Sequence, residues 1–127
     1  MFDQILGTII LVFFIGSICD PRNGLPDFLK PAFIGLLLTL IGITLGMNTG
    51  YAINPARDLG PRLLCWTAGY GERLFQDLSH LYWILVPVIG PLIGAVLGGW
   101  LYRGYQYLTD EARCLAAENE KPEKFDV

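Results

Sequence analysis

Apolar residues gather in three long segments of this chain, and short stretches of polar and turn-forming residues separate them. The segments cover approximately residues 2–19, 31–47 and 81–106. A helix crosses the hydrocarbon core of a bilayer with about 20 residues, so each segment is predicted to be a transmembrane helix. A further uncharged run begins at residue 48 and leads into a short helical pattern that ends near 66. The pattern therefore predicts an all-α membrane protein with three spans and one additional short helix.

Basic residues flank the predicted spans unevenly. Arg22 and Lys30 lie in the first connection, while Arg103 lies in the last turn of the third span and Arg113 follows it, together with two lysines near the C-terminus. Positive residues favour the cytoplasmic side, so the first connection and the C-terminus are expected to be cytoplasmic and loop 67–79 to face outside. Residues 109–127 are rich in Glu, Lys and Ala, which predicts a cytoplasmic tail that is a frayed helix or disordered.

The composition supports the membrane interpretation and excludes other classes. Hydrophobic residues make up 53% of the chain and charged residues 17%, against about 25% charged in soluble domains. No basic face is available for nucleic acid, and no nucleophile–base pair or phosphate loop suggests an enzyme. Three widely spaced cysteines and a single histidine argue against disulfides and against a metal or other cofactor. The N-terminal segment lacks the basic residues of a signal peptide, so it is interpreted as a mature span.

The segment between the second and third spans carries the candidate chemistry. Asn54 is a strong helix cap and Pro55 suits the first helical position, so a helix is predicted to begin here and to end near Trp66. Residues 48–53 would then form irregular backbone ahead of it. Together they have the form of a re-entrant loop and half-helix within 48–66.

Irregular backbone and ionisable residues at membrane depth are tolerated where they line a cavity or meet a partner. Backbone carbonyls from 48–53, the positive end of the half-helix and the Arg57 guanidinium would then line a path for neutral hydroxylated solutes and oppose cations. An extracellular loop with an ordinary capped helix is the alternative. The residues by themselves leave both interpretations open.

At this segment the chain resembles the aquaporin family, and in particular its aquaglyceroporin branch. Asp58 after the Asn-Pro-Ala-Arg sequence is typical of that branch, and the similarity continues over Gly50-Tyr51-Ala52-Ile53-Asn54-Pro55-Ala56-Arg57-Asp58-Leu59-Gly60-Pro61-Arg62. The resemblance covers residues 1–108 and implies the C-terminal half of a right-handed helical bundle. The family's first three spans and first Asn-Pro-Ala helix have no counterpart in these 127 residues, so the chain is expected to be an incomplete channel, a fragment or a short isoform.

The resemblance also implies roles for individual residues. Arg57 matches the arginine of the selectivity filter, Gly42 a filter position that is histidine in water-selective members, and Tyr51 a filter position that is often aromatic. Asp58 and Arg62 match a branch-specific pair that is expected to be structural. The motif itself is Asn54, Pro55 and Ala56, and the implied solute-contacting residues are Gly42, Tyr51, Ala52, Ile53, Asn54 and Arg57.

Three functions are compatible with these features. The first is a passive channel for glycerol, water and urea, which in the complete protein is implied to be a homotetramer in the plasma membrane. The second is a non-conducting product that associates with full-length channels and modifies them. The third, a membrane-embedded enzyme or transporter subunit, is disfavoured because no other polar cluster is present.

Glycines recur every fourth residue in the third predicted span, at Gly90, Gly94 and Gly98. They share one helix face, where small residues allow a neighbouring helix to approach closely. Packing within one channel unit and self-dimerisation both fit this spacing.

Overall fold

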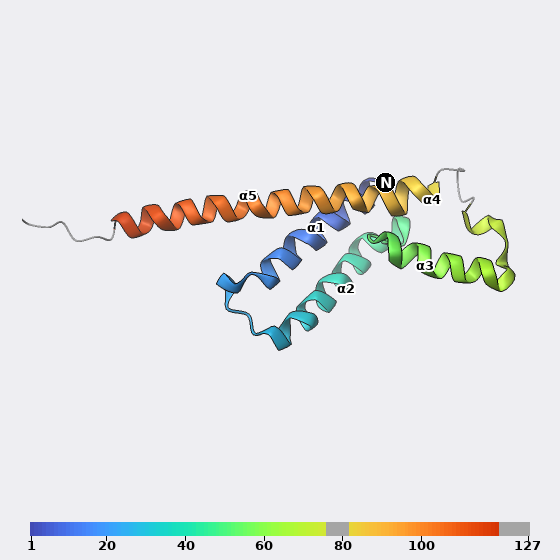
Figure 1. Cartoon of the computed structure of the whole chain (residues 1–127), viewed down its shortest axis with the longest axis horizontal. Coiled ribbons are helices and arrows are strands. Elements are labelled where there is room, and N and C mark those ends of the chain that lie inside the picture. Colours follow the sequence, from blue (N-terminus) through green and yellow to red (C-terminus); the bar gives the residue numbers. More distant parts are fainter. Residues whose placement is uncertain (76–81, 120–127) are drawn as a thin grey trace, which may run out of the picture.

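The chain is built of helices. A computed structural model describes residues 1–75 and 82–119, and within these ranges it contains no strand. Three helices of the described part are long and apolar enough to cross a membrane, over Phe2–Cys19, Asp27–Met47 and Leu85–Ala116, so the prediction of an all-α protein with three spans is confirmed. The α-helices are α1 (Phe2–Cys19), α2 (Lys30–Thr49), α3 (Pro55–Cys65), α4 (Tyr82–Ile84) and α5 (Gly90–Asn119) (Figure 1).

Short turns of other helix types complete the described backbone. The first connection contains 3-10 turns over Pro21–Asn23 and Asp27–Leu29. A π-helical turn extends α3 over Trp66–Tyr70, and another joins α4 to α5 over Leu85–Ile89. A last 3-10 turn spans Glu72–Phe75.

Two helix ends differ from the sequence-based boundaries. Helix α2 continues to Thr49, so the irregular backbone begins at Gly50 rather than at residue 48. Gly50 ends the helix in the left-handed conformation, with φ 69°, and its N–H donates to the Gly46 carbonyl at 3.0 Å. Helix α5 continues to Asn119, past the predicted end of the third span at residue 106 and into the tail, for which a frayed helix was one of the two predictions. Leu81, at the predicted start of the third span, and residues 120–127 lie outside the described residues.

Helices α1 and α5 pack along their length, and glycines of α5 set how closely they approach. A Cβ built on Gly94 would lie 2.5 Å from the Ile5 carbonyl oxygen, and one on Gly98 would lie 2.8 Å from the Ile9 carbonyl oxygen. The residue numbers of the contacts rise together along α1 and α5, so the two helices run parallel. Two parallel spans require the intervening α2 to cross in the opposite direction. Because the glycine face is occupied by α1, its role is packing inside this chain.

Replacing Gly94 by alanine is expected to lower the free energy of unfolding by about 2 kcal/mol, because the new methyl group cannot fit against the α1 backbone. Thermal unfolding of the chain in detergent micelles, followed by helical circular dichroism, measures the change. Gly99→Ala is the matched control, since a Cβ at Gly99 meets nothing within 4 Å. Equal unfolding temperatures for the two variants would contradict close packing at Gly94.

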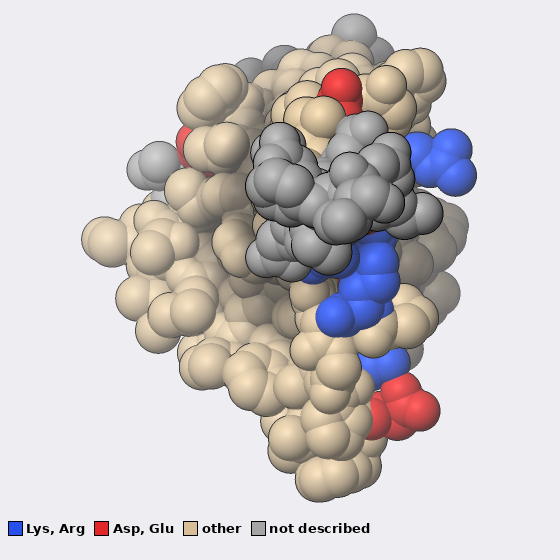
Figure 2. Space-filling view, turned by 90° about the vertical axis from the view of Figure 1, so that its left-hand side faces the viewer, with Lys and Arg blue, Asp and Glu red and all other residues tan. Residues whose placement is uncertain are grey.

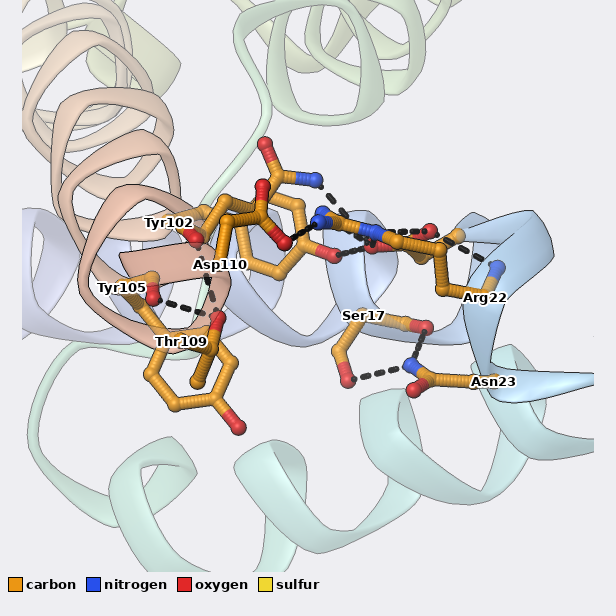
Figure 3. A network of polar contacts seen from close by, with 9 residues as sticks. Ser17, Arg22, Asn23, Tyr102, Tyr105, Thr109 and Asp110 are labelled. Carbon is orange, nitrogen blue, oxygen red and sulfur yellow. Dashed lines mark hydrogen bonds and ion pairs between the residues drawn. The ribbon is translucent and has the colours of Figure 1, made fainter. Parts of the chain in front are cut away.

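A polar network joins the first connection to α5 at the end of the molecule where α1 stops (Figure 3). Asp20 accepts hydrogen bonds from the Tyr102 hydroxyl at 2.6 Å and from the Gln106 amide at 3.1 Å. Arg22 pairs with Asp20 at 2.8 Å and with Asp110 at 2.6 Å. The first connection and the C-terminal part of α5 therefore lie at the same end, where basic side chains gather along one side of the surface (Figure 2).

The network makes the stability of this end dependent on pH. Hydrogen bonds from Arg22, and next from Tyr102, hold the pKa of the Asp20 carboxyl well below its usual range. A carboxyl whose pKa is lower in the folded than in the unfolded chain stabilises the fold fully at pH values well above the unfolded pKa, which is about 3.9. That stabilisation is lost progressively as the pH falls from about 5 toward the lower folded pKa.

Acidification from pH 7 to about pH 2 is therefore expected to lower the unfolding temperature of the native chain more than that of Asp20→Asn. The asparagine keeps the side-chain length but cannot titrate. Asp110→Asn is the control, because Asp110 is exposed and contacts Arg22 alone among the described residues. Parallel pH profiles for the native chain and Asp20→Asn would show that Asp20 does not carry the effect.

Candidate functional site

Asn54 begins α3 and caps it. Its extended backbone, with φ −148°, turns the side chain onto the first helical turn, where Oδ1 accepts from the N–H of Ala56 at 2.9 Å and of Arg57 at 3.4 Å. Pro55 occupies the first helical position, where its missing N–H is harmless. Asn54 is exposed, and within the described residues its Nδ2 group makes no hydrogen bond. The amide therefore remains available as a donor at the positive end of the helix.

The backbone ahead of this cap turns sharply. Gly50 is left-handed, and the non-glycine residues Tyr51 and Ile53 also have positive φ, each 41°. A β-branched residue adopts this conformation only when its surroundings impose it, at a cost of about 1–3 kcal/mol. The N–H of Asn54 donates to the Ala52 carbonyl and closes a three-residue turn around Ile53. The strain lies immediately next to the helix cap.

Two polar side chains of α1 hold Ile53 in this conformation. Gln4 Oε1 accepts from the Ile53 N–H at 2.7 Å. The Thr8 hydroxyl is shared between two carbonyl oxygens, that of Gln4 at 2.7 Å and that of Ile53 at 3.2 Å. Gln4 is fully buried and Thr8 is 4% exposed. A Cβ on Gly7 would lie 3.0 Å from Ile53 Cγ2, so the isoleucine side chain lies directly against α1. The bend is thus held mainly through the Ile53 N–H, and the shared Thr8 hydroxyl adds a longer contact at the Ile53 carbonyl.

Gln4 and Thr8 were not among the site residues inferred from the sequence. Their contacts to Ile53 join positions 49 and 45 residues apart, so no local pattern reports them. One signal was present: two polar residues, spaced four apart, interrupt the start of an apolar span. Polar side chains inside a span generally face protein rather than lipid.

Arg57 reaches back from the first turn of α3 over the bend. One guanidinium nitrogen donates to the Tyr51 carbonyl at 2.9 Å, and Cζ lies 4.4 Å from the centre of the Tyr51 ring. That cation–π contact and the hydrogen bond fix the guanidinium beside the turn while the residue stays exposed. The Tyr51 ring in turn lies against Gly42, where a Cβ would come 3.1 Å from Cζ of the ring. The room left by Gly42 is therefore occupied by Tyr51.

Asp58 and Arg62 face each other one turn further along α3. The pair has two contacts, at 2.8 Å and 3.0 Å, and is half-buried. Arg62 also donates to the Leu74 carbonyl, which ties the Glu72–Phe75 turn to α3. The charges of this pair are thus engaged with each other and with the backbone rather than directed at the bend.

The bend presents backbone carbonyls and fixed donors at one place. Among the described residues, the Tyr51 and Ala52 carbonyls each accept one hydrogen bond, and the Ile53 carbonyl shares the Thr8 hydroxyl with Gln4, so each has a second lone pair. Ala52 and Ile53 are buried, 7% and 3% exposed, so their side chains offer little to a solute and their carbonyls are the groups to consider. The described residues contain no cluster of acidic, histidine and cysteine side chains suited to a metal ion. The arrangement suits recognition of neutral hydroxyl groups.

Comparison with known proteins gives a consistent result. The model of the family "Major intrinsic protein" matches residues 1–102. Aquaporin-9 of Homo sapiens is 42% identical over 130 aligned positions, which cover 98% of this chain and 43% of that protein. Aquaporin-3 of Milnesium tardigradum is 46% identical over 87% of the chain and 35% of its own length, and human aquaporin-10 is 43% identical over 80% and 33%. The chain thus spans less than half the length of these curated relatives.

Proposed function

We propose, from the premise that this chain belongs to the major intrinsic protein family, that it forms the C-terminal half of a passive channel for water and small neutral solutes. The observation that carries the proposal is the capped start of α3, where the Asn54 amide and the Arg57 guanidinium are held beside a strained bend and remain exposed. Ionisable residues between membrane spans commonly line a solute or ion path, which supports a conducting role.

The geometry suggests how solutes are selected. A solute hydroxyl accepts a hydrogen bond from Asn54 Nδ2 or Arg57 and donates one to the free lone pair of a backbone carbonyl. A cation meets the fixed charge of Arg57 and the positive end of α3, both of which oppose its passage. Conduction of neutral solutes needs no chemical step, so the proposed role is a channel and not an enzyme.

The solute class proposed is glycerol, with water and urea also passing. Asp58 after the motif and a glycine at position 42 support this choice through the resemblance to aquaglyceroporins. We further propose the plasma membrane as location, with the first connection and the C-terminus in the cytoplasm, and a homotetramer as the complete assembly. The basic residues at the end shared by the first connection and α5 support the orientation (Figure 2).

A chimera tests the function directly. In it, the segment of human aquaporin-9 that aligns with this chain, 43% of that protein, is replaced by residues 1–127. Liposomes that contain this aquaporin-9 chimera, placed in an osmotic gradient of glycerol, are expected to shrink and then swell again as glycerol enters. Empty liposomes and unmodified aquaporin-9 are the references. A chimera that inserts correctly but passes neither glycerol nor water would refute the proposal.

The chain by itself provides a second measurement. Asn54 and Arg57, at the start of α3, are exposed, which favours either a partner half or a second copy in the membrane. Glycerol-driven swelling of liposomes that contain only the purified chain would mean that copies assemble into a pore. Without swelling, but with insertion established, the chain acts as part of a larger channel or as a non-conducting modulator of one.

A further inference from the structure

Gly46 lies one helical turn beyond Gly42 on α2, and the Tyr51 ring spans both glycines. A Cβ built on Gly46 would come 2.8 Å from Cδ1 of the ring and 3.3 Å from Cε1. On Gly42 the nearest atoms are Cζ at 3.1 Å and the two Cε atoms at 3.3 Å. The ring therefore lies along a flat strip of α2 backbone, with its hydroxyl end at Gly42 and the end nearer its own backbone at Gly46.

The backbone directs Tyr51 onto this strip. Gly50 is left-handed and ends α2, and its N–H donates to the Gly46 carbonyl. The chain therefore changes direction one helical turn after Gly46. Tyr51 then adopts φ 41°, which returns its side chain to the helix that has just ended. Arg57 lies over the ring, 4.4 Å from its centre, and bonds the Tyr51 carbonyl. The position of the guanidinium is thus coupled to the position of the ring.

We propose that Gly46 is a specificity-determining position of the channel, because its missing side chain seats the Tyr51 ring and thereby places Arg57. This inference rests on the proposed channel function and extends it to a residue that does not itself contact the solute. Carbon atoms in contact prefer separations of about 3.5–4.0 Å, so a methyl group at Gly46 would displace the ring by about 1 Å. The ring carries Arg57 with it toward the solute path.

The consequence is a change in selectivity. A displaced ring and guanidinium narrow the path, and a bulky solute loses more from narrowing than water does. Gly46→Ala in the aquaporin-9 chimera is therefore expected to lower the ratio of glycerol to water permeability by about tenfold, the usual effect of one methylene group in a fitted site. Osmotic swelling in glycerol and in sucrose gradients measures the two permeabilities.

Gly35→Ala is the matched control, because Gly35 lies on the same helix and a Cβ there meets nothing within 4 Å. Both substitutions raise intrinsic helix propensity equally, so a difference between them reports the contact with Tyr51. The ratio should stay unchanged in Gly35→Ala. A normal ratio in Gly46→Ala would overturn the proposal.

Removing the ring makes the test specific. In a Tyr51→Ala background no ring packs against Gly46, so adding Gly46→Ala is expected to change neither the permeability ratio nor the inserted amount. Should Gly46→Ala alone fail to insert, insertion that is restored by adding Tyr51→Ala supports the proposed contact between position 46 and the Tyr51 ring, whereas failure in both backgrounds overturns the proposal. A parent chimera that passes no glycerol would instead refute the proposed function, which keeps the two failures distinguishable.

Discussion

Replacing Gln4 by leucine is expected to abolish most glycerol conduction by the aquaporin-9 chimera while leaving the three spans inserted. The substitution keeps the approximate volume but removes the acceptor of the Ile53 N–H, which then lies buried and unpaired at a cost of about 1–3 kcal/mol. The strained φ of Ile53 costs a similar amount, so the bend is expected to relax. A shift of 1 Å in a positioned site can reduce its activity about 100-fold, and stopped-flow swelling measures the loss.

Two further variants identify the cause. Gln4→Glu retains an acceptor oxygen at the same place and is expected to keep most of the conduction. Ile53→Gly can adopt φ 41° without strain, so in that background Gln4→Leu should cost much less. An equally severe Gln4→Leu defect in both backgrounds, or loss of insertion, would mean that Gln4 supports the helix packing in general rather than the bend.

The contacts of Gln4 and Thr8 with Ile53 could not be predicted from the sequence. The spans followed from runs of apolar residues, and the start of α3 followed from the preference of Asn54 for the cap and Pro55 for the first turn. Both signals are local, since they depend on residues within one element. The strained conformation of Ile53 has no such signal, because isoleucine does not favour positive φ and its support comes from a distant helix.

The packing of the Tyr51 ring on the α2 glycines could not be predicted for the same reason, because it also depends on contacts between distant parts of the chain. In the sequence, Gly42 was interpreted through the family resemblance as a filter position that is histidine in water-selective members. Only the reversal of the chain after Gly50 brings the aromatic ring back onto the glycine strip. A glycine that widens a path and a glycine that accommodates a neighbouring ring look identical in one sequence. The physical difference lies in tertiary packing.

Arg57 is the second residue whose loss should have a large effect, because it places a fixed charge where few other charges are available. Among the described residues of the bend and the first turn of α3, Asp58 is the nearest opposite charge in sequence, and Arg62 already engages it through two contacts. The Arg57 guanidinium is bound to a neutral carbonyl and a neutral ring, so its charge is not cancelled locally. On the proposed path, a solute that passes the bend would therefore meet a positive potential.

Replacing Arg57 by alanine is accordingly expected to relax the exclusion of cations while neutral solutes continue to pass. A unit charge about 6 Å away, at an effective dielectric constant near 20, raises the energy of a cation by about 3 kcal/mol, which corresponds to roughly 100-fold in rate. Proton entry into liposomes of the aquaporin-9 chimera, followed with an internal pH dye under an imposed potential, measures the change. Arg57→Lys keeps the charge and should keep the exclusion, and Arg73→Ala removes an exposed charge outside the bend and should have no effect. Unchanged proton flux in Arg57→Ala would show that the barrier to cations lies elsewhere, with the dipole of α3 as the remaining source of positive potential at the bend.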